Sequence, residues 1–107
     1  MNSTATIRTT LVVDVGPVAE AAGIIARETT LAEHVTFTAD GWTATVEITD
    51  GLPFEVWGSG TQALWRLLSA IAYTGETVSL YEVASRLDAR NSAAVADALR
   101  VLFGGAR

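Results

Sequence analysis

Two alternating runs on either side of Asp40-Gly41 constrain the fold of this chain more than any other feature. Through residues 34–49, apolar side chains alternate with threonine and glutamate, which is the period of a strand with one buried face. Asp-Gly between two such runs is typical of the two-residue type I′ turn of a β-hairpin. The sequence therefore predicts strands near 34–39 and 42–49. The expected cross-strand pairs are Ala39 with a buried Trp42, Phe37 with Ala44 and Val35 with Val46.

The segment ahead of the hairpin predicts one strand and one helix. Apolar residues at alternate positions within Thr6–Val15 indicate the strand. Gly16-Pro17 ends it, and proline is favoured at the first position of a helix because its missing N–H needs no partner there. The apolar stripe of that helix is Val18, Ala21, Ala22 and Ile25. Gly23 within it leaves two interpretations open, close backbone packing or no structural role.

Residues 59–104 predict three helices. A serine followed three residues later by glutamine or glutamate forms a capping box, and such pairs occur at Ser59–Gln62 and Ser79–Glu82. Asn91 is a favourable N-cap for the third helix. Apolar residues recur at helical spacing in each segment. The expected helices run from Ser59 to about Gly75, from Ser79 to about Leu87 or Asp88, and from Asn91 to Gly104.

These elements predict an α+β fold with the order β-α-β-β(-β), followed by three helices of which the last two resemble a helix-turn-helix. Leu52, Phe54 and Val56 supply the optional fourth strand, and Pro53 would place it at an edge or a bulge. One domain is expected over residues 1–107, with a strand-rich layer at 1–58 and a helical half at 59–107. We expect the first of the three helices to cover the apolar face of the sheet, and the last two to pack on its other side.

Composition excludes several classes of site. The chain has no cysteine and no lysine, so it can form no disulfide, thiolate zinc site or Walker phosphate loop. No uncharged apolar run approaches the roughly 20 residues that span a bilayer, and the N-terminus lacks the pattern of a signal peptide. The prediction is a cytoplasmic protein without a cofactor or bound metal and without a membrane contact.

The charge is unevenly distributed along the chain. Residues 1–50 carry two arginines and seven carboxylates, whereas residues 51–107 carry five of each. The first half therefore holds the whole net charge of −5. Because an acidic surface repels phosphate, binding to nucleic acid is not favoured. The neutral helical half can meet a copy of itself, so we expect a homodimer through that half.

His34 is the one candidate for catalytic chemistry. In the expected register it lies opposite Glu47, and a proton-transfer or metal constellation with Asp14 is one interpretation. The other is a surface cross-strand pair, and we favour it because a metal site needs three or four converging ligands. We therefore predict no catalytic residues, no metal ligands and no enzymatic activity.

The segment with Val83, Ala84 and Leu87 inward, a short turn, and then Val95, Leu99 and Leu102 inward resembles the helix-turn-helix of small bacterial regulators. In that family the second helix enters the major groove by its N-terminal residues, which here are Ser92, Ala93, Ala96 and Asp97, flanked by Arg90 and Arg100. These side chains depart from the arginine, lysine, asparagine and glutamine that read base edges. With the block LDARN, residues 59–104 also resemble small uncharacterised proteins of actinobacteria and their phages.

The leading functional prediction is a non-catalytic interaction module, a small acidic regulator of phage or actinobacterial type that acts by binding another protein. The alternative is a helix-turn-helix regulator that binds nucleic acid. Small residues on the last two helices admit close contact, and arginine and tyrosine are enriched among residues that dominate binding energy. The predicted partner-binding residues are Tyr81, Arg86, Arg90, Ala93, Asp97 and Arg100.

Overall fold

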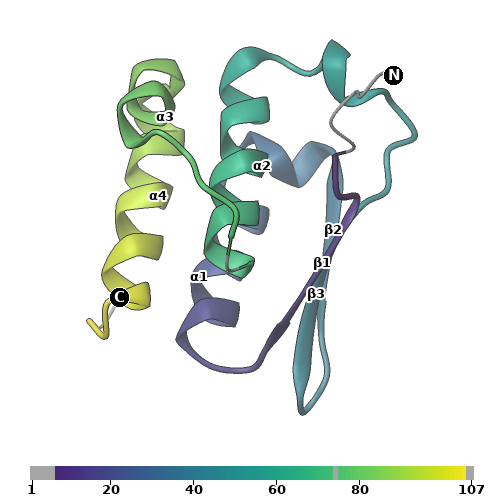
Figure 1. The fold of residues 1–107 in the computed structure, drawn as a ribbon, viewed down its shortest axis with the longest axis vertical. Coiled ribbons are helices and arrows are strands. Elements are labelled where there is room, and N and C mark those ends of the chain that lie inside the picture. The colour runs from purple at the N-terminus through teal and green to yellow at the C-terminus, as the bar shows by residue number, and fades with distance from the viewer. Residues whose placement is uncertain (1–6, 74, 106–107) are drawn as a thin grey trace.

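Three layers stack in the structure, which is a computed structural model describing residues 7–73 and 75–105. A three-stranded sheet forms the first layer, α1 and α2 form the second, and α3 with α4 forms the third (Figure 1). The α+β class is therefore confirmed. The elements are β1 (Thr10–Asp14), α1 (Pro17–Glu28), the 3₁₀ helix η1 (Thr30–Glu33), β2 (Val35–Ala39), β3 (Thr43–Ile48), the 3₁₀ helix η2 (Phe54–Val56), α2 (Ser59–Ala72), α3 (Leu80–Arg86) and α4 (Ala89–Leu102).

The sheet has the order β1-β3-β2, and both pairs of strands are antiparallel. The predicted hairpin is present, but its register differs by two residues. The observed pairs are Ala39 with Ala44, Phe37 with Val46 and Val35 with Ile48. A shift of two keeps every side chain on its predicted face, because side chains alternate with a period of two. Ala44 and Val46 are therefore buried as expected, while threonines line the opposite, open face.

The register shift moves the turn and exposes Trp42, which the sequence placed in the core. Asp40 donates its N–H to the carbonyl of Thr43 at 2.9 Å, so Gly41 and Trp42 form the loop. Neither has the positive φ that a type I′ turn requires. The Asp40 carboxylate instead accepts the N–H groups of Trp42 and Thr43, both at 2.7 Å. Trp42 is 84% exposed at the hairpin tip.

Helix α1 begins at Pro17 as predicted and lies against the sheet. Gly23 is buried there, and a Cβ added to it would lie 3.1 Å from the ring of Phe37 and 3.1 Å from the guanidinium of Arg27. Of the two interpretations of Gly23, close packing is the one that the structure supports.

Helices α1 and α2 share the core, and the apolar stripe expected in α2 is confirmed: Leu64, Leu67 and Leu68 are buried. The predicted capping box at its start is wrong. Gly58 is the N-cap, and the Ser59 side chain forms no capping bond. Gln62 does reach back, but its side-chain NH₂ donates to the carbonyl of Trp57 at 2.9 Å, whereas in a capping box its oxygen would accept the N–H of the cap residue.

The optional fourth strand is absent from the described part of the chain, and the 3₁₀ helix η2 takes its place. Pro53 opens this turn, and Trp57 follows it into the core with only 4% of its surface exposed. The sheet therefore has β1 and β2 as its two edge strands.

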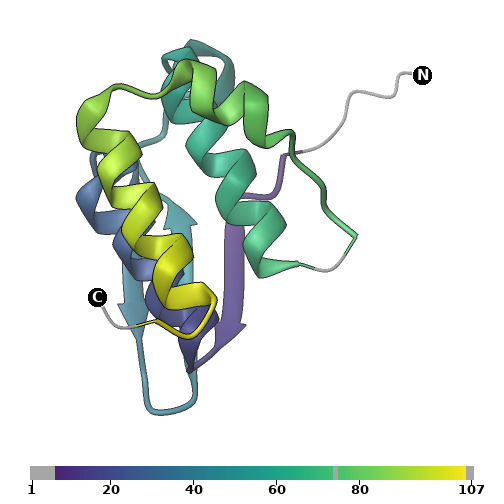
Figure 2. The ribbon, with the colours of Figure 1, turned by 90° about the vertical axis from the view of Figure 1, so that its left-hand side faces the viewer.

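The third layer packs differently from the prediction. Helix α3 lies on α2 as expected, and a Cβ at Gly60 would lie 2.6 Å from the carbonyl oxygen of Arg86. Helix α4 packs mainly against α1 instead (Figure 2). The second layer thus consists of two helices side by side, and each carries one helix of the third. Within the described residues, no helix combines the length and apolar character needed to cross a membrane.

Candidate functional site

The start of α4 is fixed to the core by hydrogen bonds that the sequence prediction missed. Asp88, not Asn91, is the N-cap, and its carboxylate accepts the N–H of Asn91 at 2.8 Å. Asn91 lies inside the helix and is buried. Its side-chain oxygen accepts the N–H of Thr30 at 3.1 Å, and its amide donates to the Thr30 hydroxyl at 3.2 Å. The Thr30 hydroxyl also contacts that of Thr61 at 2.7 Å. These bonds join η1, α2 and α4.

Ser79 caps the start of α3 as predicted, its side-chain oxygen accepting the N–H of Glu82 at 3.2 Å. Leu87 and Asp88 connect it to α4. Figure 2 shows α3 crossing the upper end of the third layer while α4 runs down its length. The connection is as short as that of a helix-turn-helix.

An apolar groove of about 250 Å³ lies between these two helices. We call it the α3–α4 groove; it is lined by Leu80, Val83, Ala84, Leu87, Ser92, Val95, Ala96 and Leu99. Val83 and Val95 form its buried floor, and Leu80 is 61% exposed at its rim. Tyr81 stands beside it with 82% of its surface exposed. Contiguous exposed apolar side chains are typical of a protein contact surface.

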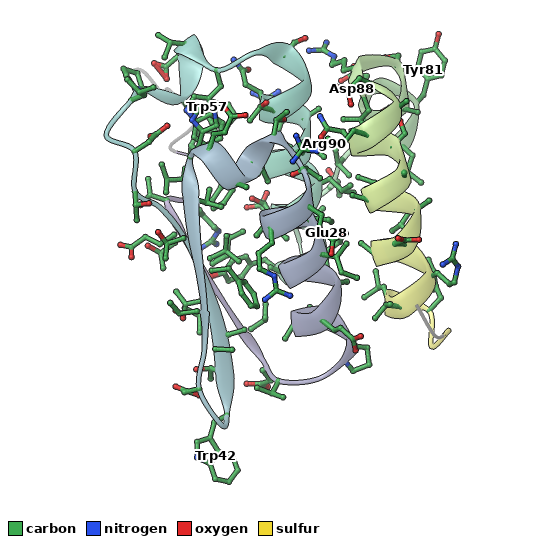
Figure 3. The ribbon with its side chains drawn as sticks, turned by 180° about the vertical axis from the view of Figure 1, so that it is seen from behind. Glu28, Trp42, Trp57, Tyr81, Asp88 and Arg90 are labelled. Carbon is green, nitrogen blue, oxygen red and sulfur yellow. The ribbon has the colours of Figure 1, made fainter. Side chains whose placement is uncertain are left out.

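The predicted partner-binding residues are accessible, but they do not form one site. Tyr81 points outward beside the groove, whereas Arg90 lies on the other side of the helix pair (Figure 3). On α4 the residues Arg90, Ala93, Asp97 and Arg100 share a side about a third of a turn from the groove, by their spacing. Arg86 instead lines a small hollow between α2 and α3. The sequence feature that could have indicated the groove is that Leu80, Ala84 and Leu87 recur at helical spacing, although the fold leaves all three at least partly exposed.

The charges around the groove are balanced. Arg100 donates to the carboxylate of Asp97 at 3.1 Å. The remaining charged residues of the two helices and their connection are Arg86, Arg90, Glu82 and Asp88. The first residues of α4 therefore present no net positive charge to a phosphate backbone.

His34 belongs to an aromatic cluster at the opposite end of the sheet from the hairpin tip. The predicted partner Glu47 is wrong, because the register places Glu47 opposite Thr36. The imidazole Nδ1 shares a hydrogen bond with Asp50 instead. The His34 ring also stacks on Trp57, with ring centroids 4.5 Å apart and planes at 24°.

The pairing with His34 lowers the pKa of Asp50, and the N–H of Leu52, donating to the same carboxyl, lowers it further. The ionised carboxylate therefore stabilises this corner of the fold at pH values above the usual pKa of an aspartate. Asp14 pairs with Thr43 at the hairpin end of the sheet, far from His34 along the strands. Within the described residues, no group of three or more acidic, histidine or cysteine side chains could hold a metal ion.

No protein-family model, curated protein or solved structure matches this chain.

Proposed function

We propose that this protein is a non-catalytic interaction module that binds another protein through the α3–α4 groove. The observation that carries the proposal is the groove itself, whose lining is mostly apolar, with Leu80 exposed at its rim and Tyr81 exposed beside it. The occupant that fits is an amphipathic helix, because the groove between two helices accepts the side-chain ridge of a third. Tyr81 supplies the rigid aromatic surface that often anchors such contacts.

Charge supports a protein partner over nucleic acid. Proteins that bind duplexes neutralise phosphates with clustered lysine and arginine, while α3, α4 and their connection together carry equal numbers of arginines and carboxylates. Ser92, Ala93 and Ala96 at the start of α4 also lack the hydrogen-bonding reach that reads base edges. A helix-turn-helix regulator remains the runner-up, supported by the short connection between α3 and α4.

The test is affinity capture from an extract of the cells that make the protein, with three baits compared side by side. These are the wild type, a Leu80→Ser/Tyr81→Ser variant and a matched Trp42→Ser control, which removes an equally exposed aromatic from another surface. We expect the specific partner to be retained by the wild type and the Trp42→Ser control, and lost with the groove variant. Retention by the groove variant would contradict the proposal.

Two further measurements separate the competing occupants. If a second copy fills the groove, sedimentation will show a dimer that the Leu80→Ser/Tyr81→Ser variant cannot form. If the runner-up is correct, random duplex DNA will bind with an affinity that falls steeply with salt. If either result is obtained and no partner protein is captured, the occupant is a second copy of the chain or DNA, and the proposal of a partner helix is wrong.

A further inference from the structure

Strand β1 forms one edge of the sheet and leaves half of its main-chain groups without a partner strand. Its neighbour β3 bonds to the odd-numbered residues, as the contacts of Thr9 and Val15 at its two ends show. The N–H and C=O groups of Thr10, Val12 and Asp14 therefore point away from β3. Such a row of groups is a template for pairing with another strand.

A hollow of about 550 Å³ runs beside this edge, between the end of β1 and the last turn of α2. Apolar side chains line most of it, including Val12, Val15, Val18 and Ile71. Val12 within β1 is 47% exposed and Val15, just after the strand, is 54% exposed, so apolar surface lies open along this edge. The hollow could receive every second side chain of a strand laid along the edge.

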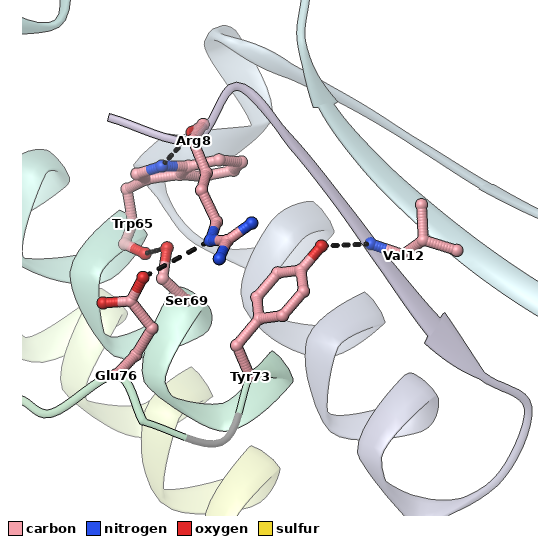
Figure 4. Close-up of polar contacts among 6 residues, drawn as sticks. All are labelled: Arg8, Val12, Trp65, Ser69, Tyr73 and Glu76. Carbon is pink, nitrogen blue, oxygen red and sulfur yellow. Dashed lines mark hydrogen bonds and ion pairs between the residues drawn. The ribbon is translucent and has the colours of Figure 1, made fainter. Parts of the chain in front are cut away.

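Tyr73 is the single contact at the outward N–H groups of β1 among the described residues (Figure 4). Its hydroxyl lies 3.5 Å from the Val12 nitrogen, at the outer limit of a hydrogen bond. The Arg8 guanidinium lies 4.1 Å from the centre of the Tyr73 ring and pairs with Glu76 at 3.4 Å. Trp65 holds this arrangement on α2 by donating to the Arg8 carbonyl at 2.9 Å. The tyrosine hydroxyl thus occupies a position at which the main-chain groups of an added strand would form a shorter, stronger hydrogen bond.

We infer that the β1 edge is a second binding site, which accepts an extended segment of a partner protein as a fourth strand. The outward main-chain groups of β1 would hold the bound segment in an extended conformation. The hollow beside them would select segments whose alternate side chains are apolar. The other side chains of the segment would lie over the open face beside Asp14 and, one strand further, Glu47. Basic residues complement those carboxylates and the net charge of the chain.

The opposite edge is less suited to the same role. At β2, the guanidinium of Arg27 lies 4.7 Å from the centre of the Phe37 ring, so a charged side chain stands at that edge. That cation would repel the basic side chains of the proposed segment, whereas the carboxylate of Asp14 on β1 attracts them. At β1 the comparable cation, Arg8, lies ahead of the strand and is paired with Glu76.

The experiment selects a displayed library of random peptides on the wild-type protein, with counter-selection on Val12→Pro. Proline removes the outward N–H and places its ring where the added strand would lie, while no bond to β3 is lost. We expect enriched peptides in which apolar residues alternate with arginine or lysine. A synthetic enriched peptide should bind Val12→Pro at least about tenfold more weakly, since one main-chain hydrogen bond and close contact are lost.

Two controls keep the outcome clear if Val12→Pro fails to fold. A copy of the peptide methylated on alternate amides should lose binding to the wild type, and Tyr73→Phe should bind the unmodified peptide more tightly because the competing hydroxyl is gone. Leu80→Ser/Tyr81→Ser should bind the peptide like the wild type, so this site and the α3–α4 groove can fail separately. The inference is overturned if no peptide depends on its main-chain amides, if binding maps to β2, or if sedimentation shows that a second copy already covers β1.

Discussion

The α3–α4 groove and the β1 edge are both open and apolar, but they can recognise different features of a ligand. In the groove, the helices satisfy their own main-chain groups, so a ligand meets side chains such as Leu80 and Tyr81 alone. At the edge, the outward groups of Thr10, Val12 and Asp14 have no partner strand. The first surface selects by shape, and the second selects a backbone conformation first. The comparison shows that exposed apolar area does not by itself define a partner.

The largest loss of stability is expected from a change in the core, on which both surfaces depend. Trp65 is buried, touches Trp57 edge-on, and donates to the Arg8 carbonyl beside the β1 edge. Trp65→Ala should lower the free energy of unfolding by about 3–5 kcal/mol and remove binding at both surfaces. Denaturant unfolding measures this, with Trp42→Ala as the exposed control. Similar losses in the two variants would contradict the assigned core.

Asn91→Ala should separate the two surfaces. It leaves the N–H of Thr30 without its partner and loosens the start of α4, so the loss of stability should be about 1–3 kcal/mol. Binding at the groove should weaken, whereas peptide binding at the β1 edge should be unchanged in protein that is still folded. Calorimetric titration of the two ligands gives the comparison, and equal weakening at both sites would show that they are coupled.

His34→Ala should affect stability without affecting either surface. Loss of its stacking on Trp57 should cost about 1 kcal/mol. The His34 bond is also the main cause of the lowered Asp50 pKa, so that pKa should rise in the variant. A lowered carboxyl pKa stabilises the fold above the unfolded value and ceases to do so as pH falls through the folded value. The variant should therefore unfold in acid at a higher pH than the wild type; an unchanged acid transition would contradict the Asp50 assignment.

The smallest effect on stability is expected for Arg86→Ala combined with Arg90→Ala. Both side chains are exposed, and exposed charges contribute little to stability, so the free energy of unfolding should change by less than about 0.5 kcal/mol. Because both lie outside the groove, partner binding should weaken less than in Leu80→Ser/Tyr81→Ser. A larger loss than in that variant would move the binding surface to the arginine side of α4.

The sequence predicted the elements better than the contacts between them. Alternation and helical spacing report which face of an element is buried, and those faces are confirmed in β3 and α2. They cannot report a register shift of two, since that shift leaves the faces unchanged while it exposes Trp42. Several nearby polar residues can serve as an N-cap, and the spacing alone does not select one. Asp88 caps α4 in place of Asn91, and the Asn91 side chain bonds to Thr30.

The candidate sites were the least predictable part for the same reason. Residue type singled out Tyr81 and the arginines, but the groove depends on how far apart α3 and α4 lie, and the β1 edge depends on the strand order. Neither quantity is local in the sequence. The position of the Tyr73 hydroxyl at Val12 likewise follows from the packing of α2 against β1.

Residue-resolved amide hydrogen exchange of the free protein tests the central contrast between the two surfaces most directly. The account predicts that the outward amides of Thr10, Val12 and Asp14 exchange at least about a hundredfold faster than those of Leu11 and Val13, which bond to β3. The amides of Val95 and Leu99 beneath the groove should be protected like Leu11, because they lie within α4. Equal protection along β1 would mean that its edge is already covered in solution, and would contradict the account.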